Sequence, residues 1–337
     1  MNIVLALGNS ADTGGPTAYA NNMRERFITR GHAVRFVTYG PLLRRLPSGI
    51  RHLGYAGKLY WHLLRSDAAL GFDTMTVGVP LMLASALARR PYLIRVGGDF
   101  VWEQYVERTG DLIKLSRFYA EAKNKLSFKA RLEMRLTRAV VRRAARVLFN
   151  SAWLKDIWRK EYGFDDAKTF ILENVYPPRR AGMPPEGRVF VAAGRPIKLK
   201  QENVLREIFE ELQKKHPDIS LDTKVLPAAE HAARVARAYA VVLPSIGDVS
   251  PNAIIDAVVA GKPFVCTDDT GIKERLAGTG LFVDTQDEGA LAAAVESLLD
   301  KATYDEVAAR VRAFAFVRTW DDLAEEALRE IKKVCAY

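Results

Sequence analysis

Two aspartates near the start of a predicted helix could bind the hydroxyl groups of a substrate. Asp248 and Asp256 are eight positions apart in the segment VVLPSIGDVSPNAIIDAVVAGKPFVC. The apolar run that ends at Pro244 predicts a strand, and the pattern after Pro251 predicts a helix. A carboxylate that accepts a hydrogen bond from a sugar hydroxyl contributes about 1.5–3 kcal/mol. The segment therefore predicts a strand, a polar loop and a helix that together could hold a sugar.

The start of this helix could also bind a diphosphate. In a parallel α/β sheet, the loop that leaves a strand places backbone N–H groups and the positive helix end at the carboxyl edge of the sheet. Ser250, Pro251 and Asn252 occupy this position. A second loop carries two cations, Arg195 and Lys200, after another predicted strand. Fixed positive charge there would stabilise a departing diphosphate.

The length and the alternation of elements predict two α/β domains. A chain of 337 residues exceeds the usual size of one domain. Predicted strands and helices alternate in both halves, which indicates two doubly wound, Rossmann-like domains. The Pro, Gly and Arg-rich stretch between Tyr176 and Pro185 is the best linker. We therefore expect domains over residues 1–178 and 179–318, followed by a helix over residues 319–337.

Positive charge is concentrated in the front half. Residues 1–180 carry 30 Lys and Arg against 15 Asp and Glu, so they contribute +15 to the net charge of +10 and the remainder contributes −5. This asymmetry favours an acidic partner: an anionic membrane, a phosphate-bearing acceptor or nucleic acid. Charge that serves only solubility is the alternative.

Cysteine usage and hydropathy favour a cytoplasmic protein. Cys266 and Cys335 are the only cysteines, and neither belongs to a CxxC motif or a Cys/His cluster. The first residues lack the charged start and long apolar core of a signal peptide, and no apolar run is long enough to span a bilayer. We expect membrane contact, if any, to be peripheral and at the inner face.

The segment with the two aspartates resembles the donor site of retaining GT-B glycosyltransferases, most closely glycosyltransferase family 4. In that family two glutamates, separated by seven residues, are followed by alanine and then Gly-Lys/Thr-Pro. In this chain Asp248 and Asp256 stand at the glutamate positions, and each is shorter by one methylene. The other matching residues are Ala257, Gly261, Lys262, Pro263, Gly194, Arg195 and Lys200.

This resemblance implies a GT-B-like fold, in which two Rossmann-like domains face each other across a cleft. Residues 1–178 would bind the acceptor, residues 179–318 the nucleotide sugar, and the helix over 319–337 would cross back to the first domain. The implied reaction transfers a sugar to an acceptor hydroxyl with retention of configuration. The sequence contains no metal-binding cluster, so we expect a reaction without metal, and we expect no cofactor. The donor would lie among Arg195, Lys200, Asp248, Ser250, Pro251, Asn252 and Asp256.

The front half supplies weaker candidates. Gly14 and Gly15 follow the first predicted strand and resemble the family's Gly-Gly loop near the donor diphosphate; a plain tight turn is the alternative. Many family 4 enzymes place a histidine after the predicted strand at 92–96, where this chain has none. Asp99 is the candidate replacement, with Glu103, for bonding the acceptor or the transferred sugar. A helix cap is the alternative for this pair.

Trp102, between those two acids, could stack on a sugar ring at the acceptor. A separate prediction concerns a basic amphipathic helix over residues 123–148, which could lie on anionic lipid. The alternative is an ordinary helix with its apolar face on the sheet and its arginines in water. Its basic ridge consists of Arg131, Arg135, Arg138, Arg142 and Arg146, beside an apolar stripe of Phe128, Leu132, Leu136, Val140 and Val147.

Several other functions remain open. A GT-B epimerase would need placed acid and base groups, and a phosphorylase of the glycogen type would need a cofactor-binding lysine. A degenerate transferase could keep donor binding without turnover. A noncatalytic nucleic-acid-binding protein could use the basic half, but no nucleic-acid module is recognisable. We therefore expect a nucleotide sugar and a glycan or lipid-linked acceptor as partners, and no nucleic acid.

Overall fold

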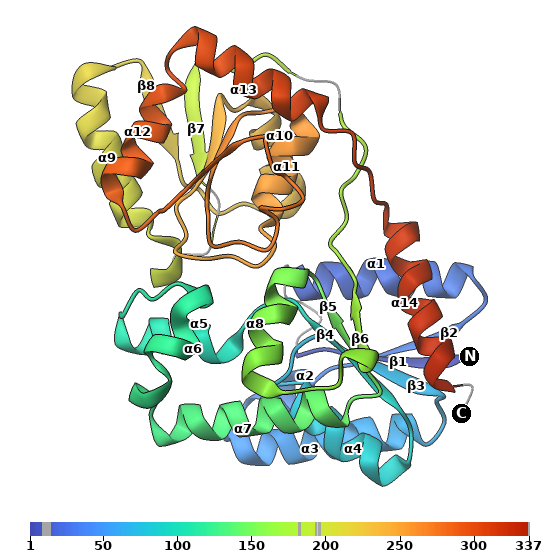
Figure 1. Ribbon diagram of the computed structural model, residues 1–337. Helices are drawn as coiled ribbons and strands as arrows, with labels where there is room; N and C mark the ends of the chain where they lie inside the picture. Colours follow the sequence, from blue (N-terminus) through green and yellow to red (C-terminus); the bar gives the residue numbers. More distant parts are fainter. Residues whose placement is uncertain (9–14, 181–182, 193, 195–196, 336–337) are drawn as a thin grey trace. The chain divides into compact units, whose positions relative to one another are not determined.

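The computed structural model describes residues 1–8, 15–180, 183–192, 194 and 197–335. The chain divides into two compact units, each with one parallel sheet that has helices on both faces (Figure 1). Unit 1 consists of Met1–Val101, Lys125–Val175 and Thr319–Tyr337, and unit 2 consists of Trp102–Asn124 and Tyr176–Arg318. The α/β class predicted from the sequence is confirmed.

Unit 1 is built on a six-stranded sheet with the order β2-β1-β3-β4-β5-β6. The strands are β1 (Asn2–Ala6), β2 (Ala33–Val37), β3 (Ala68–Gly71), β4 (Tyr92–Val96), β5 (Arg146–Phe149) and β6 (Thr169–Ile171). All residues of β3 and β4 are buried, as expected for the central strands of a sheet covered on both faces.

The helices of unit 1 form a layer on each face of this sheet. One layer contains α1 (Gly15–Thr29) and α14 (Trp320–Cys335). The other contains α3 (Ser48–Leu63), α4 (Gly78–Ala88) and α7 (Phe128–Arg143), which pack in that order (Figure 1). The remaining helices are α2 (Gly40–Arg44) and α8 (Ala152–Tyr162).

The last helix returns to unit 1. Leu323, Ala327 and Ile331 of α14 are buried in the core that also contains residues of α1, β1 and β3. At its start, Asp321 accepts a hydrogen bond from Arg30 at 2.9 Å, and the Trp320 ring lies edge-on to a tyrosine of α1. An apolar stripe therefore attaches residues 319–335 to the first sheet.

Unit 2 is built on a five-stranded sheet with the order β11-β10-β9-β7-β8. Its strands are β7 (Arg188–Ala192), β8 (Ile219–Asp222), β9 (Ala240–Leu243), β10 (Phe264–Thr267) and β11 (Leu281–Val283). One face carries α9 (Glu202–Lys215) and α12 (Glu288–Ser297), and the other carries α10 (Ala228–Arg237) and α11 (Asn252–Ala260) (Figure 1). The unit also contains α5 (Phe100–Thr109), except for its first two residues, with α6 (Leu115–Glu121) and α13 (Lys301–Ala313).

The basic helix is shorter than the sequence pattern predicts. It begins after Ser127, whose Oγ accepts a hydrogen bond from the backbone N–H of Ala130, and it ends at Arg143. Arg146 lies in β5 instead, because the apolar residues that follow it are buried between β4 and β6. The predicted apolar stripe is also wrong at its start, since Phe128 and Leu132 are exposed.

Candidate functional site

Neighbouring strands of unit 2 bring the predicted donor loops to one sheet edge. β7, β9 and β10 are adjacent and parallel, so the loops that follow them leave from the same edge. The loop after β9 pairs with the loop after β10. The Asp248 N–H donates to the Asp269 carbonyl at 3.1 Å, and the Gly271 N–H donates to the Val249 carbonyl at 3.1 Å. These bonds hold the Asp248 backbone in a fixed position.

Lys200 and Asp248 form an ion pair at this edge. The distance from Lys200 Nζ to Asp248 Oδ2 is 2.6 Å, and about a fifth of each side chain is exposed, 19% and 21% respectively. Asp248 Oδ1 also accepts the Ser250 N–H at 3.2 Å. Three of the residues predicted from the sequence thus lie together, and a ligand can reach the pair from solvent.

Backbone geometry around Lys200 is restrictive. A Cβ atom at Gly194 would lie 3.1 Å from Lys200 Cγ, so a glycine lets the lysine stem lie against the backbone. Gln201 follows with a left-handed φ of 45°. Its side-chain amide donates to the carbonyls of Pro244 and Thr285 at 2.7 and 3.1 Å. This buried amide links the β7 and β9 loops, and no local sequence pattern predicts it.

The start of α11 lies directly after this pair. Pro251 is its N-cap residue and Asn252 its first helical residue, and Asn252 is exposed. The first N–H groups of a helix have no acceptor within the helix, and the macrodipole makes that end positive. The Oγ of Ser245 in the same loop is fully buried and has no partner within the described residues. These groups can bind an anion next to Lys200.

Asp256 contacts different groups from Asp248. It lies on the fifth residue of α11, and its Oδ2 is 3.9 Å from Nε2 of His231 on α10. Burial raises the pKa of Asp256 to about 6, an effect that Arg180 opposes. Asp248 therefore lies before α11 and Asp256 in its second turn, and the described residues offer no partner common to both.

Asp256→Asn should stabilise unit 2 in a pH-dependent way. Because the pKa of Asp256 in the folded state lies above its ordinary value, the folded state holds a proton from about pH 4 to 6. Above that window the half-buried carboxylate is ionised at a cost in free energy. The side chain is 36% exposed, so solvent screening reduces the cost to about 1 kcal/mol. We expect urea unfolding to show this gain at pH 8 and none at pH 4. An equal gain at both values would contradict the assignment.

The front-half candidates lie in interior positions. Asp99 of unit 1 is fully buried, and its Oδ2 accepts a hydrogen bond from Trp158 Nε1 at 2.8 Å. Trp102 is only 2% exposed and donates to the Ile113 carbonyl at 2.7 Å. Glu103 is half-buried in the first turn of α5. Burial of Asp99 and Trp102 favours structural roles over direct sugar contact.

Three predicted site residues remain: Gly14, Gly15 and Arg195. Gly15 is the first residue of α1. Gly14 and Arg195 lie outside the described residues.

A segment from the front half completes the loop cluster of unit 2. The domain boundaries predicted from the sequence include residues 102–124 in the first domain, whereas in the structure these residues belong to unit 2. Nζ of the buried Lys114 lies 2.8 Å from both Asp268 Oδ1 and Asp284 Oδ1, after β10 and β11. Burial acts to raise the pKa of Asp284, but the hydrogen bond from Lys114 acts against it, and the pKa of Asp284 lies below its ordinary value. No pattern in the sequence connects Lys114 to these aspartates.

A polar cluster in unit 1 consists of residues that the sequence does not predict as site residues. Tyr39 Oη lies 2.5 Å from His52 Nδ1 and donates to the Thr76 carbonyl. The half-buried Asp73 accepts a hydrogen bond from Thr76 Oγ1 at 2.5 Å. Tyr39 follows β2 and Asp73 follows β3, so this cluster lies at the carboxyl edge of the first sheet. His52 lies on α3 and does not follow a strand, so the family's pattern of a histidine after a strand does not predict it.

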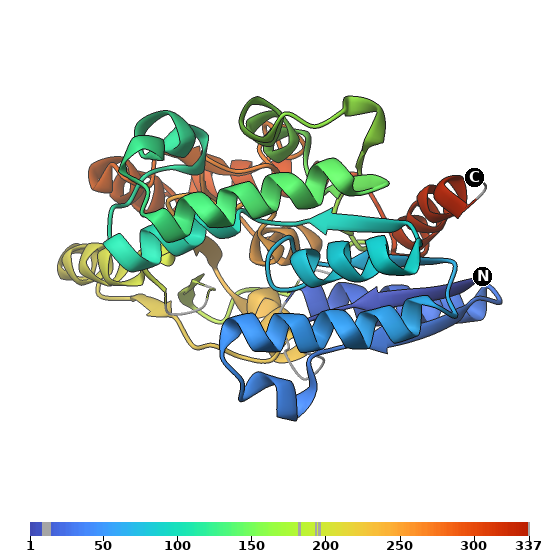
Figure 2. The same cartoon turned by 90° about the horizontal axis from the view of Figure 1, so that it is seen from below.

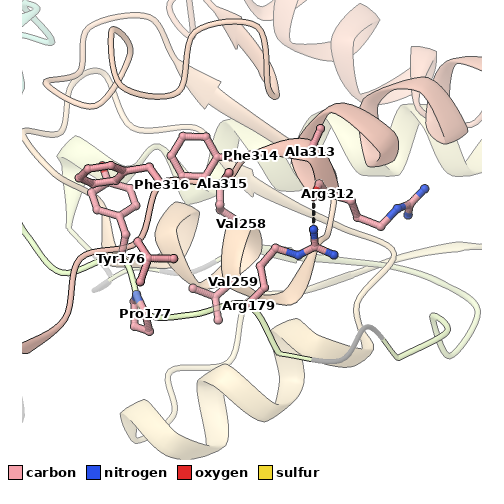
Figure 3. A pocket seen from close by; sticks show the side chains of 11 residues that line it. Tyr176, Pro177, Arg179, Val258, Val259, Arg312, Ala313, Phe314, Ala315 and Phe316 are labelled. Atoms are coloured by element: carbon pink, nitrogen blue, oxygen red, sulfur yellow. Dashed lines mark hydrogen bonds between the residues drawn. The ribbon is translucent and has the colours of Figure 1, made fainter.

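Two cavities lie in unit 2. The larger, about 560 Å³, adjoins the Lys200 loop. The smaller, about 240 Å³, is lined by apolar side chains together with Arg179 and Arg312, and none of its lining residues is a predicted site residue (Figure 3). The larger is lined by Gly110, Leu112, Ile197, Lys198, Gln201, Glu202, Asn203 and Val204. The smaller is lined by Tyr176, Pro177, Arg179, Val258, Val259 and residues 312–317.

Comparisons with known proteins agree with this geometry. Residues 166–301 match the family model described as Glycosyl transferases group 1. No curated protein gave a significant match by sequence. Sucrose-phosphate synthase from Thermosynechococcus elongatus is similar in structure, with a TM-score of 0.72 at 14% identity, covering 100% of this chain and 99% of that chain.

Two further structures are similar at equally low identity. HepE from Anabaena, in complex with UDP and glucose, has a TM-score of 0.70 at 13% identity and covers 99% of this chain and 100% of that chain. A protein from Listeria monocytogenes described as a UDP-N-acetylglucosamine 2-epimerase has a TM-score of 0.63 at 14% identity, with coverages of 98% and 96%. These likenesses concern the fold.

The matched segment contains the site described above. Residues 166–301 include Lys200, Asp248 and Asp256, together with the sheet of unit 2. The GT-B-like fold expected from the sequence is confirmed by the two sheets and by the similar structures. Residues 166–301 of this chain are therefore similar to the glycosyl transferases of group 1.

Proposed function

We propose that this protein transfers a sugar from a nucleotide-sugar donor to an acceptor hydroxyl with retention of configuration. The observation that carries the proposal is the ion pair of Lys200 and Asp248 beside the start of α11, within the family segment. The pair supplies one cation for a phosphate and one carboxylate for sugar hydroxyls. A uridine nucleotide is the first donor to test, because HepE structures contain UDP and UDP-glucose.

In the proposed reaction, the diphosphate binds at the amino end of α11 and next to Lys200. Positive charge that is already in place stabilises the charge that develops on the leaving phosphate, without reorganisation at the moment of transfer. Arg195 and the Gly14-Gly15 loop would add to this binding. Because Lys200 and the helix N–H groups supply the positive charge, the proposal includes turnover without an added metal.

Asp248 and Asp256 would orient the donor from two sides of the helix start. Asp248 accepts hydrogen bonds from sugar hydroxyls once Lys200 turns toward the phosphate, and Asp256 bonds the nucleoside part. Glu103 acts on the acceptor side, and the fully buried Asp99 supports it only as a positioning residue, by holding the buried Trp158 indole. A hexose is the expected sugar, and a glycan or lipid-linked alcohol is the expected acceptor.

The acceptor side carries a second part of the proposal, contact with an anionic membrane. Of the arginines proposed for it, three make contacts within unit 1. Arg138 bonds Glu161, Arg142 bonds the carbonyls of Tyr162 and Gly163, and Arg146 bonds Glu330. Arg131 and Arg135 are exposed, so they are the members of this ridge best placed to meet lipid phosphates.

A screen of donors tests the proposed function. UDP-, GDP-, ADP- and TDP-sugars would be added with a metal chelator, and the thermal shift and release of free sugar would be measured. We expect one nucleotide class to stabilise the protein, by about 2.7 kcal/mol when the ligand is at about a hundred times its Kd. Stabilisation by no nucleotide would overturn the proposal.

Epimerisation of a nucleotide sugar is the alternative to sugar transfer, because one similar structure is described as an epimerase. An epimerase would convert its nucleotide sugar without an acceptor. NMR of the sugar after incubation with the stabilising donor distinguishes the two reactions. Inversion at one ring carbon without an acceptor would favour the rival, and a new glycosidic bond would favour transfer.

A further inference from the structure

The solvent-facing side of α3 carries a stripe of large apolar residues. Ile50, Leu53, Trp61 and Leu64, the last at the C-cap, are 58%, 67%, 71% and 41% exposed. With Gly57 they follow each other at steps of three, four, four and three, which places them on one face of the helix. The opposite face is buried against the sheet and α4 through residues such as Tyr55, Leu59 and Leu63. Packing within unit 1 therefore explains why the inner face of α3 is apolar, but it does not explain the exposed apolar stripe.

The stripe continues across the helices next to it. Figure 2 shows α3, α4 and α7 side by side on this face of unit 1, as their contacts also indicate. Ten of the fourteen large apolar side chains that are exposed among the described residues lie on this layer, on α2, or within two residues after α2 or α3. They are Leu42, Leu46, Ile50, Leu53, Trp61, Leu64, Leu83, Leu87, Phe128 and Leu132. Exposed apolar surface concentrated in this way marks an interaction surface.

Charge on the same layer has one sign. The sequences of α2, α3, α4 and α7 contain a single acidic residue, Glu133, and it is buried. Arg51, Lys58 and Arg65 each follow a position of the stripe by one residue, so they form a basic edge along it. Arg44, Arg45, Lys129, Arg131 and Arg135 add exposed positive charge on α2, just after it and on α7.

Apolar side chains flanked by cations, without exposed carboxylates, fit the headgroup region of an anionic bilayer. There, apolar residues reach the acyl boundary, tryptophan favours the interface, and long basic side chains extend to the phosphates. The core of a protein interface would instead be depleted of charge. No described helix is long and apolar enough to cross a bilayer. We propose that the outer face of α2, α3, α4 and α7 docks on an anionic lipid surface, with the α3 stripe inserted.

Vesicle binding by the full chain tests this surface. The probes are vesicles of phosphatidylcholine alone and of equal parts phosphatidylcholine and phosphatidylglycerol. We expect binding to the anionic vesicles only, with a blue shift of tryptophan fluorescence that Trp61→Phe removes. Leu53→Ser with Trp61→Ser should lower the partition coefficient at least about tenfold, because it removes apolar area that would be buried in lipid. Both side chains are exposed, so the variant should fold.

Ile28→Ser with Val225→Ser is the matched control, since it removes two exposed apolar side chains outside the layer. This control should bind vesicles like the parent protein. Equal loss in both double variants, or equal binding in all three proteins, would overturn the proposal. Concentration-dependent dimerisation that Leu53→Ser with Trp61→Ser abolishes, without vesicle binding, would also overturn it in favour of a second copy of the chain. This inference extends the membrane contact of the proposed function to a defined surface. Donor stabilisation is measured separately and should not change, so the lipid surface can fail while the proposed sugar transfer stands.

Discussion

Lys200→Ala should lower kcat for sugar transfer by about 10²–10³, the effect of removing one preorganised charge-stabilising group. Its Nζ lies 2.6 Å from Asp248 Oδ2, in the loop just before α11. Among the described residues, no other cation bonds that carboxylate. A cation that acts on the departing diphosphate matters most when that charge develops, so kcat should fall more than the affinity for the donor.

The structural alternative for Lys200 predicts a different result. If the lysine only anchors the Asp248 loop, its removal lowers the free energy of unfolding and leaves kcat per folded molecule unchanged. Steady-state kinetics and urea unfolding of the same preparations separate these cases. Lys214→Ala is the control, because this lysine is exposed near the far end of α9 and bonds only Glu211 among the described residues. It should retain full activity and stability.

Arg146→Ala should lower the free energy of unfolding by about 3 kcal/mol, because it leaves a buried carboxylate with one cation fewer. Glu330 of α14 is only 1% exposed, and its Oε2 lies 3.1 Å from Arg146 Nε. Its remaining partner is Lys333, at 2.6 Å from Oε1, whose side chain is half exposed. The loss of Arg146 therefore weakens the attachment of the last helix to β5.

Two further variants make this prediction specific. Arg131→Ala removes an exposed arginine from the same basic run and should change the free energy of unfolding by less than about 0.5 kcal/mol. Replacing Glu330 by leucine in the Arg146→Ala background should restore part of the loss, since no buried charge then remains. Chemical unfolding measures all three. Equal small effects of Arg131→Ala and Arg146→Ala would show that Arg146 is a surface charge.

The sequence by itself determined the class of the fold and the order of the loops at the donor edge. Alternating apolar runs and helical patterns are local, and Pro, Gly and Asp mark where each strand ends, so the β9 loop and the start of α11 follow from neighbouring residues. Since parallel strands present their following loops at one edge, Lys200 and Asp248 could be placed in one region before any contact was known. The ion pair between them agrees with that placement.

Only the tertiary structure decided which polar groups are partners and which faces are buried. Lys114 bonds Asp268 across 154 positions of sequence, and Arg146 bonds a glutamate of the last helix. The sequence predicts that Asp99 and Trp102 contact the acceptor or the transferred sugar, but long-range packing buries both. The α3 stripe has the spacing of a core face and is nevertheless exposed. Such outcomes depend on which elements become neighbours, because burial and pairing are set by contacts distant in sequence, while propensity and spacing describe only a few residues at a time.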